Sequence, residues 1–142
     1  MGKINRTRVL LGGLLAGLIL NVGEAALHAG VLAQATEDAY KALNRTIPGD
    51  PISLASLVVM TFAQGILAVW LYAAIRPRRG PGPKAAICAG LAVWFFSAFY
   101  AAVYLRAGFA GIFPDGVIGI PVAWELVEFP LATLAGAAVY KE

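Results

Sequence analysis

The sequence predicts an all-helical (all-α) integral membrane protein, a four-helix bundle whose transmembrane helices run up-down-up-down. Of its 142 residues, 60% are hydrophobic and only 13% are charged, whereas about 25% of the residues in a soluble domain are charged. Four apolar stretches each reach about 20 residues, the length that an α-helix needs to cross a bilayer. Because the chain is the size of one domain, residues 1–142 are predicted to form a single transmembrane domain.

The four predicted helices follow one another with short connections. Their ranges are 9–33, 52–75, 85–105 and 116–140. In the first connection, Thr36 is expected to cap a short helix over residues 36–44, and Pro48 stops it. This short helix is predicted to lie on the outer membrane surface.

Lys and Arg residues gather on one side of the predicted membrane. Three lie in the N-terminal tail and four lie in the connection 76–84, whereas the connection 106–115 holds one Arg and one Asp. Because positively charged connections stay in the cytoplasm, both termini are predicted to be cytoplasmic. The basic connection is interpreted as a determinant of topology, so the lipid bilayer is the expected partner and no nucleic acid is expected.

Two similarities between the halves of the chain point to a pair of related helical hairpins. Residues 27–30 (LHAG) resemble residues 105–108 (LRAG), and both segments lie near the outer end of an odd-numbered predicted helix. Residues 67–68 (LA) and 73–74 (AA) in the second helix likewise match residues 131–132 (LA) and 137–138 (AA) in the fourth. An internal duplication with parallel halves explains this pattern. In addition, four glycines predict close contacts between helix backbones: Gly12, Gly13, Gly17 and Gly136.

Each predicted helix carries one stripe of polar residues. With cytoplasmic termini, the four stripes lie at matching depths, from the middle of the membrane toward its outer face, so we expect a polar pocket that opens outward. An ionisable group at such depth costs roughly 2.5–3.5 kcal/mol on insertion scales and usually faces the interior of a bundle. The predicted ligand-binding residues are Asn21, Glu24, His28, Thr61, Gln64, Ser97, Tyr100, Glu125 and Glu128.

The three glutamates in this set have no intramembrane Lys or Arg to neutralise them. They are therefore either protonated or bound to a cation. A divalent metal is the candidate cofactor, although the Glu-x-x-His repeat of di-iron bundles is absent. The predicted metal ligands are Glu24, His28, Glu125 and Glu128. Hydrogen bonding between helices is the favoured alternative for four members of the ligand-binding set, Asn21, Thr61, Gln64 and Ser97.

Three interpretations of the function remain open. The leading one is a protein whose polar pocket binds a cation or a small polar ligand, with transport requiring an oligomer such as a homodimer. The second is a non-catalytic accessory subunit of a larger membrane complex. The third is a small membrane oxidoreductase that uses a metal or a quinone near the glutamates. No phosphate loop, serine-hydrolase elbow or zinc-protease motif is present, so no catalytic residue is assigned and a conventional soluble-type enzyme is excluded.

Three segments resemble uncharacterised small four-helix bacterial membrane proteins. They are residues 21–24 (NVGE), 70–77 (WLYAAIRP) and 124–128 (WELVE). The resemblance covers most of the chain, and it implies four helices in a bacterial inner (cytoplasmic) membrane. It implies no activity and no catalytic residue.

Overall fold

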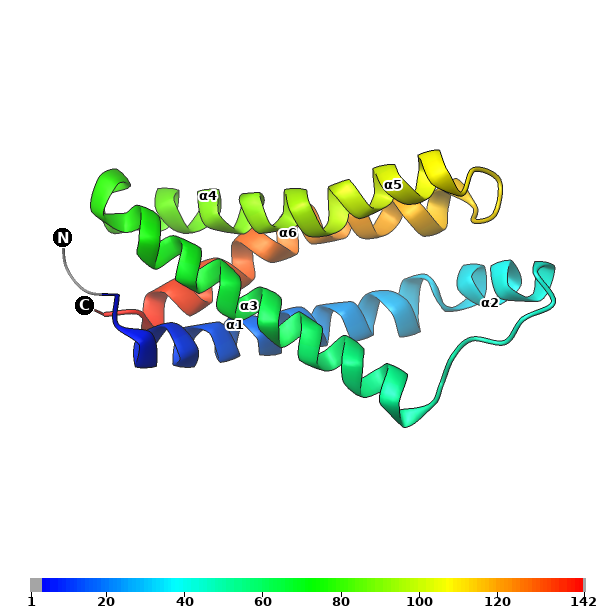
Figure 1. Ribbon diagram of the computed structural model, residues 1–142, viewed down its shortest axis with the longest axis horizontal. Helices are drawn as coiled ribbons and strands as arrows, with labels where there is room; N and C mark the ends of the chain where they lie inside the picture. Colours follow the sequence, from blue (N-terminus) through cyan, green and yellow to red (C-terminus); the bar gives the residue numbers. More distant parts are fainter. Residues whose placement is uncertain (1–3, 142) are drawn as a thin grey trace.

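The computed structural model describes residues 4–141, and all regular secondary structure in that range is helical (Figure 1). The all-helical prediction is therefore confirmed. In order, the elements are α1 (Arg6–Ala26), the π-helical turn η1 (Leu27–Val31), α2 (Ala33–Ala42), α3 (Pro51–Arg79), α4 (Pro83–Trp94), the π-helical turn η2 (Phe95–Phe99), α5 (Tyr100–Gly108) and α6 (Asp115–Val139).

Four stretches in this series are long and apolar enough to cross a membrane. They are Arg6–Val31, Pro51–Arg79, Pro83–Gly108 and Asp115–Val139. Each contains most of one predicted span, so the four predicted apolar helices are confirmed.

The predicted helix ends differ from the observed ones by a few residues, and two of these differences have a clear local cause. The second helix was expected to end at residue 75, before Pro77, but α3 continues to Arg79 and ends at Gly80, which has a φ of 80°. The proline removes one backbone donor, and its position in the last turn leaves the rest of the helix intact. The surface helix α2 begins at Ala33, because the N–H of Thr36 donates to the carbonyl of Leu32 at 2.8 Å. Thr36 is thus inside the helix and does not cap it.

Polar contacts fix two ends of these helices. The Asp50 carboxylate accepts a hydrogen bond from the Ser53 N–H at 2.9 Å and caps the start of α3. Hydrogen bonds from the Ser53 side chain and backbone hold the pKa of Asp50 below its usual value. At the connection from α5 to α6, Arg106 and Asp115 form an ion pair at 2.8 Å.

Successive long helices run in opposite directions, so both chain ends lie at one end of the molecule (Figure 1). We call this the termini end and the opposite one the α2 end. α1 packs against α3 and α6, and α4 packs against α6 and α3. The N–H of Asn5 donates to the Tyr140 hydroxyl at 3.3 Å, which joins the beginning of α1 to the end of α6.

Glycines bring the helix backbones together in the half of the molecule near the termini end. A methyl group added to Gly65 would lie 2.7 Å from the carbonyl oxygen of Gly13 and 2.7 Å from the Cα of Gly17. Gly12 and Gly136 approach each other in the same way, so that a methyl group on either would overlap the other's carbonyl oxygen. The predicted close contacts of these glycines are confirmed, and Gly65 adds the α3 side of the α1–α3 contact.

The two buried apolar clusters do not extend to the α2 end, where Leu27, Leu32 and Ala39 are buried outside both clusters. One buried cluster, which includes Tyr72, Ala89 and Tyr140, lies near the termini end, and a second, around Leu20 and Phe129, lies near the middle. In contrast, α5 has no buried residue. Figure 1 shows α3 diverging from α4 and α5 toward the α2 end.

Candidate functional site

The space between the diverging helices contains a cavity of about 390 Å³. This volume is within the range of small-ligand pockets. The lining comes from all four long helical stretches and includes no Lys or Arg. Its polar residues are Glu24, His28, Thr61, Gln64, Ser97 and Glu125.

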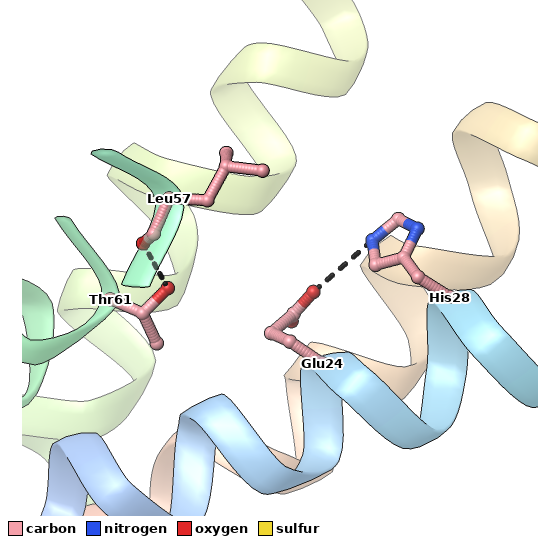
Figure 2. A network of polar contacts seen from close by, with 4 residues as sticks. All are labelled: Glu24, His28, Leu57 and Thr61. Carbon is pink, nitrogen blue, oxygen red and sulfur yellow. Dashed lines mark hydrogen bonds and ion pairs between the residues drawn. The ribbon is translucent and has the colours of Figure 1, made fainter. Parts of the chain in front are cut away.

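Glu24 and His28 form the best-defined polar contact of the cavity. The Nε2 of His28 lies 3.2 Å from Oε2 of Glu24, one turn earlier on the same helix. Figure 2 shows the Glu24 carboxyl directed toward the His28 ring, and Thr61 on α3 across the gap from Glu24. The Glu24 side chain is 26% exposed and the His28 side chain is 56% exposed, so the pair leads from the interior toward the α2 end.

Glu125 supplies the second carboxyl of the cavity from α6. It is half-buried and interacts electrostatically with both Glu24 and His28. When both carboxyls are ionised, the cavity holds two negative charges, and His28 is the one lining side chain that can become positive. The cavity therefore has an excess of acidic groups over basic ones.

The hydroxyl groups of the cavity bond to their own helices. Thr61 donates to the carbonyl of Leu57 at 3.0 Å (Figure 2), and Ser97 donates to the carbonyl of Val93 at 2.8 Å. Such bonds satisfy the hydroxyl donor within one helix, so these two residues do not link helices as the favoured alternative expected. Each hydroxyl oxygen keeps lone pairs that can accept a hydrogen bond or bind a cation. Gln64 makes no hydrogen bond with its side chain within residues 4–141.

Three residues of the predicted set lie outside the cavity lining. Asn21 donates its side-chain amide to the Gly17 carbonyl at 2.7 Å. Tyr100 is 62% exposed on the outside of α5. Glu128 lines a separate groove between α1 and α6, because residues three apart on a helix are offset by about 60° from a full turn. That offset directs Glu125 and Glu128 to different sides of α6.

The four predicted metal ligands do not form one cluster. Among residues 4–141, no group of three or more His, Cys, Asp or Glu side chains lies close enough together to hold a metal ion. Glu24, His28 and Glu125 share the cavity without meeting at a single point, and Glu128 is in the other groove. The arrangement can accept a ligand that contacts one or two carboxylates and several hydroxyl or amide groups.

Sequence reasoning missed the two π-helical turns and the apolar walls. η1 carries His28 and η2 carries Ser97, and π turns often occur at functional sites because they redirect side chains. No residue pattern identifies a π turn in a sequence. The apolar walls include Met60 and Pro121, which lie one turn from Gln64 and Glu125, so helical spacing from the polar residues is the signal that finds them.

Comparisons with known families, curated proteins and solved structures found no match for this chain. The function is therefore argued from the geometry of the cavity. Fold alone is a weak guide to function, since one helical architecture serves many activities.

Proposed function

We propose that the protein is a four-helix bundle in a bacterial inner membrane, with both termini in the cytoplasm and the cavity open to the outside. Four long apolar helices support the membrane location, and the basic N-terminal tail and connection 76–84 support the orientation. The divergence of α3 from α4 and α5 supports the direction of the opening, because it occurs at the α2 end (Figure 1).

We propose further that the cavity binds a small cation. One observation carries this proposal: two carboxyl groups, two hydroxyl groups and an amide from all four long helices line the same cavity, without a Lys or Arg. An ionised carboxylate away from water is costly unless an opposite charge compensates it. A cation in the cavity supplies that charge.

The oxygen-bearing side chains of the cavity favour a cation that binds only one or two protein groups directly. Because no group of three acidic or imidazole side chains converges within residues 4–141, a bound metal ion would keep most of its water molecules, as Mg²⁺ commonly does. Thr61, Gln64 and Ser97 provide oxygen atoms that can hydrogen-bond to such waters or to an organic ammonium ion. The cavity volume leaves room for either.

We infer that transport of this cation would require two copies of the chain. A single four-helix protomer is small for alternating access, in which two multi-helix repeats rock against each other. Binding, however, needs only the residues that line one cavity, so binding is the step to test first.

The test is calorimetric titration of the protein in phosphatidylcholine nanodiscs with Na⁺, Mn²⁺, Zn²⁺ and methylammonium. Glu24→Gln and Glu125→Gln preserve side-chain shape and remove charge, so each is expected to weaken binding about tenfold or more, which is about 1.4 kcal/mol. Glu37→Gln is the matched control, because Glu37 pairs with Lys41 on α2, outside the cavity. Binding is also expected to weaken in acid, since protons compete for the carboxylates and a protonated His28 repels a cation.

Two outcomes would contradict this proposal. Absence of binding heat for all four cations in the wild-type protein favours the accessory-subunit interpretation. Equal affinities in the wild type and in the Glu24→Gln and Glu125→Gln variants would place the binding site elsewhere. An absorbance change on titration with a reductant would support the oxidoreductase interpretation instead.

A further inference from the structure

A second cavity, separate from the one described above, lies between α1 and α6. This groove has a volume of about 740 Å³ and shares no lining residue with the cavity. Val22, Val127 and Leu131 form part of its walls, and each of their side chains is more than half exposed. In a bilayer the groove therefore opens sideways to the lipid.

Glu128 is the one ionisable residue in the groove lining. Its side chain is 9% exposed, and both carboxyl oxygens are buried without a hydrogen-bond partner within residues 4–141. The carboxyl fits into the space left by the missing side chain of Gly23, because a methyl group there would overlap Oε1. The Trp124 indole, one turn earlier on α6, is close to the carboxyl without reaching hydrogen-bond geometry.

The charges near Glu128 favour a positively charged partner. Its carboxyl interacts electrostatically with Glu24 on α1 and with Glu125 on its own helix α6, and no Lys or Arg lines the groove. Buried polar groups are rarely left without a partner, because losing their hydrogen bonds to water is costly. A donor that also carries positive charge would satisfy the oxygens and balance the carboxylates.

We propose that the groove binds a lipid-soluble amine whose ammonium group pairs with Glu128 and whose apolar chain lies along Val22, Val127 and Leu131. The amine enters from the hydrocarbon layer through the open side of the groove. Because the carboxyl oxygens are covered, this binding requires the Glu128 side chain to turn toward the groove into another staggered rotamer. A second copy of the chain is a poorer occupant, since no long helix carries Lys or Arg at this depth.

The experiment uses Trp fluorescence of the whole protein in phosphatidylcholine nanodiscs. A nitroxide-labelled alkylamine is the probe, and the alkyl alcohol with the same chain and nitroxide is its neutral counterpart. Trp124 lines the groove, so the amine is expected to quench emission in a saturable way, and Trp124→Phe is expected to remove the saturable part. The alcohol is expected to give only gradual, non-saturable quenching. Its size follows from how strongly the alcohol partitions into the lipid of nanodiscs without protein.

Replacing Glu128 by Gln isolates the role of the charge. Glu128→Gln keeps the side-chain shape and is expected to weaken amine binding about tenfold or more, whereas Glu37→Gln on the exposed surface of α2 is expected to leave it unchanged. The proposal is overturned if the alcohol quenches in a saturable way with the same affinity as the amine. This comparison uses the wild-type protein alone. Equal amine affinity in Glu128→Gln also overturns it, and so does absence of saturable quenching by the amine in the wild-type protein. Loss of the saturable quenching in Trp124→Phe distinguishes binding in this groove from amine binding in the other cavity, because Trp124 lines only the groove.

Discussion

Glu125 and Glu128 lie one turn apart on α6, but their carboxyl groups are in different environments. Glu125 lies in a cavity with hydroxyl groups, an amide and the Glu24–His28 pair. Glu128 lies against the backbone of Gly23, under an apolar groove. The small offset between positions i and i+3 of a helix is enough to separate a polar cavity from an apolar groove.

Gly23 is expected to be essential for the position of the Glu128 carboxyl. In Gly23→Ala the new methyl group overlaps Oε1 of Glu128, so the variant is expected to lose about 1–3 kcal/mol of stability, the usual cost of overpacking. Reversible unfolding by SDS in mixed micelles measures this loss.

The matched control for this prediction is Gly30→Ala in η1, where an added methyl group meets nothing within 4 Å. Adding Glu128→Ala to Gly23→Ala removes the overlapping side chain and is expected to recover most of the loss. Equal stabilities of Gly23→Ala and Gly30→Ala would show that the carboxyl does not depend on this space.

At the scale of single residues, the spacing of polar residues along a helix predicted the positions of their side chains better than the residue types did. The separation of four residues between Glu24 and His28 places them on one helix face, and the two side chains are in contact. The spacing did not predict correctly that Tyr100 lies outside the cavity. A tyrosine on a membrane helix suits either an interior pocket or the lipid interface. The separation of Glu128 from Glu125 depends on where α1 crosses α6, and this crossing involves tertiary contacts that one helix does not encode.

At the scale of elements, the long helices were predictable from the run of apolar residues. Their exact ends were not, because the end of α3 is set by Gly80 beyond Pro77, and α2 begins directly after η1. The π-helical turns also escaped prediction, since each depends on one shifted hydrogen bond rather than on a residue pattern. They matter here because both carry cavity residues.

The α1–α3 contact is expected to depend on Gly65. In Gly65→Ala the methyl group would press on the backbone of Gly13 and Gly17, and backbone cannot move aside as a flexible side chain can. A loss of about 1–3 kcal/mol is expected, measured by the same unfolding method. Gly119→Ala on α6 is the control, since nothing lies within 4 Å of its added methyl group, and its stability is expected to stay equal or rise slightly.

A loss in Gly65→Ala no larger than that in Gly119→Ala would mean that the α1–α3 contact is looser than the glycine packing indicates. A large loss of stability together with unchanged cation binding in the cavity would show that contacts near the termini end provide most of the stability. The second result is expected, because both buried clusters lie in that half and in the middle of the molecule.

At the scale of the whole molecule, the orientation of the chain in the membrane decides which side the cavity opens to. In a variant with Cys88 replaced by Ser, single cysteines at Arg45 and Pro81 report on opposite sides of the membrane. A membrane-impermeant maleimide added to intact cells is expected to label Arg45→Cys and not Pro81→Cys, because the connection 76–84 is strongly basic. Labelling of both after membrane disruption is the control, and the reverse pattern in intact cells would place the cavity opening in the cytoplasm.

The divergence of α3 gives the molecule a narrow termini end and a broad α2 end (Figure 1). In the proposed orientation, each copy displaces more area from the outer leaflet than from the inner one. Such a conical inclusion relieves elastic stress where the membrane is convex toward the outside and adds stress where it is flat or concave. Membrane shape would therefore influence where copies accumulate, and lateral pressure that compresses the outer leaflet would press α3 back toward α5.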